Sequence, residues 1–189
     1  PLAAGIEVNR VGPTATPLPN GLILIQGGLT GFSTLHPSVK AAGAETFDPK
    51  TQRFTAGTMG INRHGAALGL TDSGKAVVLG GNSTARQESS AESFDGAVWS
   101  NLPVKLSVAR ESLTLTALAN GRLLLAGGLA KTVSGVIESY DATQGQILQL
   151  TSLQIARRAH TATRLLNGNV LLVGGYDGAG ALASAEEYD

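Results

Sequence analysis

Short apolar runs alternate with turn signals along the chain, and the same alternation returns four times. Each of four apolar runs follows a turn glycine and ends in a pair of glycines. Asn-Gly or Ser-Gly between two apolar runs predicts a β-hairpin, because a tight primed turn requires positive φ. The clearest copy, HTATRLLNGNVLLVGG, therefore predicts two antiparallel strands joined at Asn167 and Gly168. The glycine pairs are Gly27–Gly28, Gly80–Gly81, Gly127–Gly128 and Gly174–Gly175.

Two further markers recur with the glycine pairs. An arginine lies eleven residues before each turn glycine, and a Glu-x-aromatic-Asp sequence follows each pair. Successive arginines are 53, 47 and 47 residues apart. A period near 50 residues indicates a repeat architecture. The arginines are Arg10, Arg63, Arg110 and Arg157, and the glutamates are Glu45, Glu92, Glu138 and Glu186.

Each repeat predicts four short strands and no helix. The second strand, such as VLLV, is apolar on both faces, as expected where sheets pack against sheets. The third strand ends at the Glu-x-aromatic-Asp sequence, and the fourth carries Phe54, Trp99 or Ile147. Four strands repeated radially are typical of propeller blades. We therefore expect an all-β protein, a β-propeller of four-stranded antiparallel blades, with repeats at roughly 10–62, 63–109, 110–156, and 157–189 plus 1–9.

The glycine pair, the aromatic residue after it and the unit of about 50 residues resemble kelch repeats. The sequence RRAHTATRLLNGNVLLVGGYDGAGALASAEEYD is similar to bacterial kelch-type repeats in particular, although the late tryptophan of the pattern occurs only at Trp99. The resemblance implies a secreted or surface-attached bacterial protein that acts as a non-catalytic binding or structural scaffold. The alternative is the propeller domain of a larger secreted enzyme, such as a carbohydrate-active or oxidase-type protein, whose catalytic parts lie outside this chain.

The composition and charge of the chain limit the kinds of partner that we expect it to bind. The 189 residues are 42% hydrophobic and 15% charged, and 14 basic residues balance 14 acidic ones. This balance argues against a nucleic-acid surface, which would need clustered lysine and arginine. No apolar run is long enough to span a membrane, and the absence of cysteine excludes thiol catalysis. We expect a protein or surface ligand as partner.

Two interpretations of the repeated arginines remain open. At the junction between blades, arginines could form a ring that binds anions, since guanidinium groups pair well with carboxylates. Alternatively, each arginine pairs with the glutamate of its own repeat. One arginine and one glutamate in every repeat favour structural ion pairs. We expect Arg63, Arg110 and Arg157 to be partly buried beside a carboxylate, and Arg10 to depart most readily from the pattern.

The histidines and nucleophiles do not recur in a catalytic pattern. His64 and His160 lie one and three residues after their arginines, and His36 lies in the longest loop. A metal site needs three or four converging ligands, so we expect none. No GxSxG motif occurs, and the glycine pairs follow a strand rather than begin a helix, unlike phosphate loops. We therefore expect no catalytic residue, no cofactor and no enzyme activity in this chain.

The loops after the glycine pairs are the candidate ligand-binding segments. Binding loops on a rigid scaffold are where propellers vary, and the first of these loops, LTGFSTLHPSVKAAGA, is the longest. Ordinary solvated loops are the alternative interpretation. The candidate ligand-binding residues are Phe32, His36, Lys40, Arg86, Tyr176 and Asp177.

The chain ends predict how the ring closes. PLAAGIEVNR at residues 1–10 aligns without gaps with FTAGTMGINR at residues 54–63, so the first residues read as a fourth strand without a preceding blade. Residue Asp189 ends a third strand that lacks a following partner. Because pairing removes exposed sheet edges, we expect Leu2 to Ile6 to hydrogen-bond to the strand ending at Tyr188. The alternative is an arc whose open edges meet another copy or further repeats.

Overall fold

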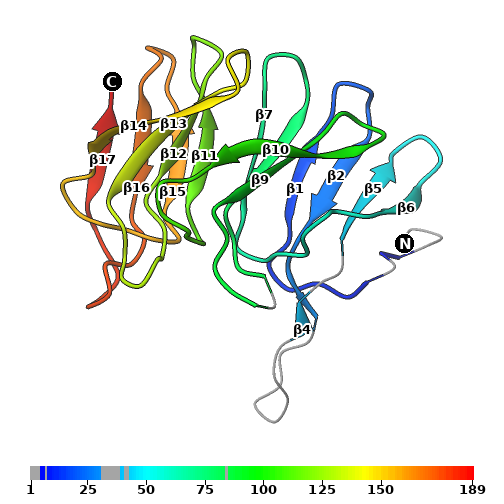
Figure 1. Ribbon diagram of the computed structural model, residues 1–189, viewed down its shortest axis with the longest axis horizontal. Helices are drawn as coiled ribbons and strands as arrows, with labels where there is room; N and C mark the ends of the chain where they lie inside the picture. The colour runs from blue at the N-terminus through cyan, green and yellow to red at the C-terminus, as the bar shows by residue number, and fades with distance from the viewer. Residues whose placement is uncertain (1–4, 7, 31–38, 41–42, 84) are drawn as a thin grey trace.

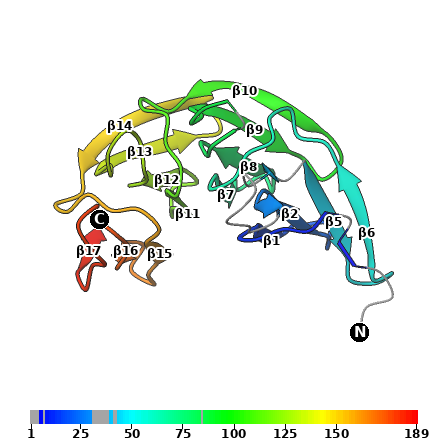
Figure 2. The same ribbon diagram turned by 90° about the horizontal axis from the view of Figure 1, so that it is seen from below.

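Four antiparallel sheets follow one another around a common axis in a four-blade β-propeller arrangement (Figures 1 and 2). This computed structural model describes residues 5–6, 8–30, 39–40, 43–83 and 85–189, with the backbone alone at 39–40. All regular structure in these residues is β-strand, which confirms the all-β propeller fold expected from the sequence. The described chain has no helix that is long and apolar enough to cross a membrane.

The strands of each sheet run from the axis outward in chain order. The innermost strands are β1 (Thr14–Pro17), β7 (Ala67–Leu70), β11 (Thr114–Ala117) and β15 (Thr161–Arg164). The second strands are β2 (Ile23–Gln26), β8 (Ala76–Leu79), β12 (Leu123–Ala126) and β16 (Val170–Val173). The third strands are β5 (Ala44–Asp48), β9 (Ser90–Phe94), β13 (Val136–Asp141) and β17 (Ala185–Tyr188). The outer strands are β6 (Arg53–Gly57), β10 (Trp99–Lys105) and β14 (Gln146–Ser152).

We number the sheets 1 to 4 in chain order, and they fall within the four repeats read from the sequence. A separate two-stranded ribbon of β3 (Leu29–Thr30) and β4 (Val39–Lys40) extends from sheet 1 (Figure 1). The outer strands carry Phe54, Trp99 and Ile147, as the sequence predicts. The innermost strands lie side by side in the order β1, β7, β11, β15, and they face the axis (Figure 2).

The hairpins between the first and second strands differ from the expected primed turn. The turn glycines have positive φ, 86° at Gly21 and 97° at Gly168, but the asparagines before them do not. The Asn167 side chain instead accepts a hydrogen bond from the Asn169 N–H at 3.1 Å. This is the longer hairpin loop in which one left-handed glycine follows the turn. In these hairpins the backbone conformation therefore requires a glycine at the turn position, but it does not require the asparagine before it.

The core consists of three apolar layers, one between each pair of neighbouring sheets. Side chains of a strand alternate between its two faces. In β8, Ala76 and Val78 pack toward sheet 1, whereas Val77 and Leu79 pack toward sheet 3. All four are buried. The second strands of sheets 2 and 3, β8 and β12, are buried along their whole length because a sheet covers each of them on either side.

The described residues do not make the closing contact expected from the sequence. Gly5 and Ile6 belong to no strand, and Leu2 to Ala4 lie outside the residues that the structure describes. Among the described strands β17 pairs with β16 alone, so sheet 4 has three strands. In both views sheets 1 and 4 lie at opposite ends of an open arc (Figures 1 and 2). Counting strands gives the number of blades, but the packed side chains determine the angle between neighbouring blades.

Candidate binding surface

The four repeated arginines are buried, and each lies beside the glutamate of its own repeat. All four side chains are 0% exposed. The shortest distance between a guanidinium nitrogen and a carboxylate oxygen is 2.7 Å in three repeats and 3.7 Å between Arg63 and Glu92. The expectation that Arg10 would depart most from the pattern is wrong. Its Nη2 lies 2.7 Å from Glu45, because Arg10 directly precedes β1 and Glu45 lies in β5 of the same sheet, so the pair needs no closed ring.

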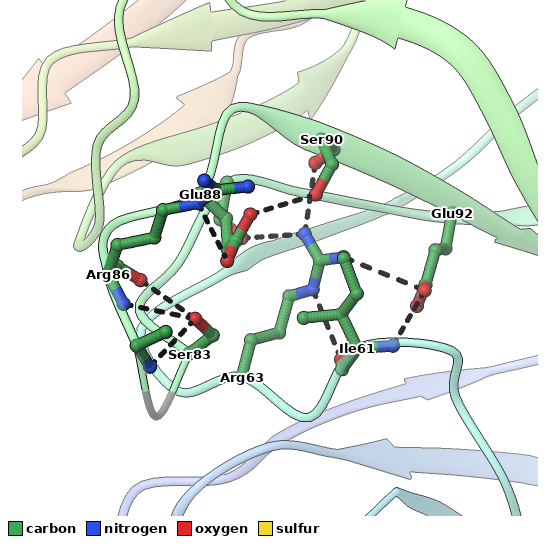
Figure 3. Close-up of polar contacts among 9 residues, drawn as sticks. Ile61, Arg63, Ser83, Arg86, Glu88, Ser90 and Glu92 are labelled. Atoms are coloured by element: carbon green, nitrogen blue, oxygen red, sulfur yellow. Dashed lines mark hydrogen bonds and ion pairs between the residues drawn. The ribbon is translucent and has the colours of Figure 1, made fainter.

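Three of the four arginines, Arg10, Arg63 and Arg157, also donate hydrogen bonds to backbone carbonyl oxygens at the strand ends. Arg63 Nη1 donates to the carbonyl oxygens of Gly80 and Ser90, both at 2.9 Å (Figure 3). Arg157 Nη1 makes the same two contacts in sheet 4, to Gly174 at 2.9 Å and Ser184 at 3.1 Å. Arg10 Nη1 likewise donates to Gly27 and Gly43, so in sheets 1, 2 and 4 the arginine joins the second and third strands of its sheet. This use of the guanidinium group explains why the arginine recurs with the glycine pair.

The glutamates accept hydrogen bonds from the chain segment that leads into the first strand of their own sheet. Glu92 accepts a hydrogen bond from the Ile61 N–H at 2.9 Å, and Glu138 accepts one from the Ser107 N–H at 2.7 Å. Burial raises the pKa of Glu92, an effect that the Arg63 charge and the backbone N–H groups oppose. Burial also lowers the pKa of Arg63, which the Glu92 charge opposes. A buried pair of this kind is strongly destabilised when one partner is removed.

The arginine ring does not provide a free anion-binding face. With no exposed guanidinium surface, none of the four arginines can meet a ligand from solvent. The structure therefore assigns these residues to the scaffold, and a binding surface must lie on other side chains.

The candidate residues of the first loop are only partly described. Phe32 and His36 lie outside the residues that the structure describes, and Lys40 ends β4 without a described side chain. No contact of these three side chains supports or opposes a ligand site.

Arg86 is exposed on the loop of sheet 2. Its side chain is 78% exposed, and its Nε lies 3.7 Å from Oε1 of the buried Glu88. Figure 3 shows Glu88 between Arg86 and the Arg63 cluster, and the Ser90 hydroxyl donates to Glu88 at 3.4 Å. The Glu88 charge also raises the pKa of Arg63, against the larger effect of burial. The Arg86 guanidinium group therefore places a positive charge at the surface, next to the buried carboxylate of Glu88.

Tyr176 and Asp177 have different roles in the loop of sheet 4. Asp177 Oδ1 accepts hydrogen bonds from the N–H groups of Ala179 and Gly180, both at 2.8 Å, so the carboxylate shapes the turn. These bonds lower the pKa of Asp177. Tyr176 lies under the Arg158 guanidinium, which is 4.9 Å from the ring centroid. Tyr176 and Arg158 together offer an aromatic and cationic surface.

Arg158 belongs to a set of equivalent positions that the sequence analysis missed. In every repeat the residue after the arginine forms a β-bridge to the residue after the glycine pair. We call these eight positions the junction row. They are Val11 and Leu29, His64 and Asn82, Glu111 and Leu129, and Arg158 and Tyr176.

Side chains of the junction row connect sheets 2 and 3. His64 Nε2 lies 3.5 Å from Glu111 Oε2, and Asn82 Nδ2 donates to Glu111 Oε1 at 3.4 Å. Gln87 donates from its side chain to the Leu129 carbonyl oxygen at 3.0 Å. His64 and Glu111 are only part-buried, with side chains 22% and 16% exposed. The row therefore presents a different pair of side chains at each repeat on one common frame.

His160 is buried beneath this row and does not join His64. Its Nε2 lies 3.0 Å from the Thr114 hydroxyl, whereas His64 Nδ1 lies 2.9 Å from the Asn82 carbonyl oxygen. Burial, with the nearby Arg157 charge, lowers the pKa of His160 to about 4, and Glu186 opposes this shift. His160 is therefore neutral at pH 7. Nowhere in the described ranges do three histidine or carboxylate side chains gather as a metal site would require.

Comparison with known proteins leaves the family open, since no family model matches this chain and no curated protein is detectably similar to it.

Proposed function

We propose that this chain is a kelch-like, non-catalytic scaffold that binds a protein ligand through the junction row and the loops beside it. The observation that carries the proposal is the contrast between repeated and varied positions. The arginines and glutamates recur in all four repeats, with the arginine side chains 0% exposed and the glutamates buried in three repeats, whereas the junction row differs at each repeat and is partly exposed. Binding proteins commonly place varied side chains on loops held by a rigid frame.

The chemistry of the row favours a polypeptide ligand. Arg158 and Tyr176 are of the residue types most often found at the energetic centres of protein interfaces. Glu111 and Arg86 add charges of opposite sign within the neighbouring sheets. A surface with both signs suits the mixed charges of a protein segment better than the uniform charge of nucleic acid.

Selection from a random peptide display library on the immobilised chain tests this proposal. The selected peptide is then titrated in solution against Arg158→Ala and Tyr176→Ala by fluorescence polarisation. We expect each substitution to weaken binding roughly 10-fold or more, because removal of a central interface residue costs about 2 kcal/mol. Arg53→Ala is the control, since Arg53 is exposed on β6 and lies outside the row.

Unchanged peptide affinity in both row variants would contradict the proposal. So would equal losses in the row variants and in the Arg53 control, because the peptide would then respond to the fold rather than to the row.

A further inference from the structure

A groove and a smaller hollow lie between sheets 1 and 2, near the outer strands β6 and β10 on the outer side of the arc (Figure 2). The groove has a volume of about 710 Å³ and is lined by β6 and by the turn between β9 and β10. The hollow, of about 230 Å³, lies between residues 58–60 and strands β9 and β10. Thr58 and Trp99 line both spaces. Their combined size is typical of small-molecule sites, which have volumes of about 300–1,000 Å³.

Two buried polar atoms of the residues that line the hollow have no hydrogen-bond partner in the part of the chain that the structure describes. They are Glu92 Oε2 and Trp99 Nε1. Glu92 is 1% exposed, and both Arg63 and the Ile61 N–H meet its other oxygen, Oε1 (Figure 3). Because about 90% or more of buried polar groups are hydrogen-bonded, an unused acceptor and an unused donor in one hollow point to a polar ligand.

The ion pair of sheet 2 is the longest of the four. Arg63 Nη2 lies 3.7 Å from Glu92 Oε1, against 2.7 Å for the corresponding contact in each of the other sheets. In sheet 4 both oxygens of Glu186 also accept backbone N–H groups, from Gln154 at 2.7 Å and from Ile155 at 3.1 Å. Glu92 therefore keeps one oxygen available where Glu186 uses two.

Gly60 leaves space beside this oxygen. It lies three residues before Arg63, and the same position before the arginines of sheets 3 and 4 is occupied by Ser107 and Gln154. A Cβ atom at Gly60 would lie 2.7 Å from Glu92 Oε1 and 3.4 Å from the side-chain oxygen of Asn101. A side chain here would therefore enter the hollow, so the glycine helps to keep it open.

One face of sheet 2 supplies the aromatic and amide groups of the site. In the β9–β10 register Trp99 pairs with Phe94, and Asn101 pairs with Glu92. Residues two apart on a strand share a face, so these four side chains lie together. The Phe94 and Trp99 rings stack with their centroids 5.0 Å apart, and both line the groove. Sheet 3 has Ile147 at the position of Trp99, so it cannot offer an indole N–H there.

The two unused atoms specify a ligand that both accepts and donates hydrogen bonds. Trp99 Nε1 requires an acceptor, which an ammonium group lacks, and the Glu92 carboxylate requires a donor, which a carboxylate ligand lacks. A hydroxyl group serves both. Saccharides carry hydroxyls on a ring whose C–H groups can pack on aromatic side chains. Thr46 and Thr55, paired across β5 and β6, add hydroxyls along the groove.

We propose that the hollow binds one sugar residue of a saccharide, with a sugar hydroxyl between Trp99 Nε1 and Glu92 Oε2. The groove holds the sugar residues attached to it. No residue of the junction row lines either space, so this is a second binding site, separate from the proposed peptide surface.

Trp99 is the one tryptophan of the chain, so its fluorescence reports directly on the hollow. The chain is titrated with the methyl pyranosides of glucose, galactose, mannose, fucose and N-acetylglucosamine. We expect a saturable change with at least one of them, with a dissociation constant on the order of 1 mM, because one ring makes few polar contacts. No saturable change with any of these glycosides would overturn the proposal. So would a saturable change with tetramethylammonium alone, which would assign the hollow to a cation.

Two variants of sheet 2 locate the bound glycoside, with isothermal titration calorimetry as the readout. Trp99→Phe keeps an aromatic ring beside Phe94 but removes the N–H donor, and it should weaken binding roughly 10-fold. Gly60→Ser introduces the residue of sheet 3 and should abolish binding, because its side chain enters the hollow. Ser107→Gly makes the reverse exchange in sheet 3 and is the matched control, which should bind as the wild-type chain does. Urea unfolding establishes that each variant is folded, and Trp99→Phe decides the question if Gly60→Ser is not.

Unchanged glycoside affinity in Trp99→Phe would overturn the proposal, and so would an equal loss in Ser107→Gly. Arg158→Ala and Tyr176→Ala, which should weaken peptide binding, should leave glycoside affinity unchanged, because neither residue lines the hollow or the groove. The saccharide site and the proposed peptide surface can therefore fail independently.

Discussion

Gly80 lies where sheet 2 meets sheet 3, and its replacement by alanine should force the two sheets apart. Its φ of 67° lies in the left-handed region. A Cβ atom there would be 2.5 Å from the Arg110 carbonyl oxygen and 3.1 Å from Leu106 Cδ1. Leu106 is a buried member of the apolar layer between the two sheets. The new methyl group therefore meets backbone on one side and core on the other.

The cost has three parts. Left-handed alanine costs about 1–2 kcal/mol, of which roughly 0.5–1 kcal/mol is offset by the lower entropy of the unfolded chain. Overpacking of a filled core adds about 1–3 kcal/mol. The displaced Arg110 carbonyl oxygen also loses its 2.9 Å bond from the Gly81 N–H, at about 1 kcal/mol. Gly80→Ala should therefore lower the free energy of unfolding by roughly 3–5 kcal/mol.

Gly145→Ala separates the backbone contribution from the packing contribution. Gly145 has a similar φ of 62°, but a Cβ atom there would meet nothing within 4 Å. It should cost only about 1 kcal/mol. Urea unfolding followed by circular dichroism gives both values. Equal losses in the two variants would refute the argument that the glycine pair is required by the approach of the next arginine.

Three other stability measurements test the scaffold and its buried groups. Glu138→Gln leaves the Arg110 charge buried without its carboxylate and should cost about 3–5 kcal/mol in urea unfolding, against less than about 1 kcal/mol for Arg122→Ala in a more exposed ion pair. Ala159→Gly should stabilise the chain by roughly 0.5–1 kcal/mol in calorimetry, because Ala159 has φ of 52°; a lower melting temperature would contradict this. The folded-state pKa of His160 is about 4, below its unfolded value near 6.5, so the unfolded chain binds a proton first as pH falls. Stability should therefore drop by about 3 kcal/mol between pH 6.5 and 4, and His160→Gln should lack this drop; an identical pH profile in the variant would show that other groups cause it.

The fold could be predicted from the sequence because the residues that recur in each repeat are ones that the fold itself requires. The glycine pairs have positive φ in all four repeats, and the second strands are apolar where sheets cover both faces. Whether the blades close into a ring could not be predicted from the sequence. The alignment of residues 1–10 with 54–63 predicts a further outer strand, but it carries no information on the rotation between sheets. That rotation depends on contacts at the axis such as the one between the Leu115 side chain and Gly69, where an added Cβ atom would lie 2.9 Å from Leu115 Cδ2.

The candidate surface was harder to predict because its residues do not repeat. Arg158, Glu111 and Asn82 have nothing in common as residue types, and a search for recurring types passes over them. A positional signal was present, since the residue after each arginine is always 18 positions before the residue after the glycine pair. Of the loop candidates, Tyr176 lies in the junction row, whereas Asp177 proves to hold a turn through its own backbone contacts.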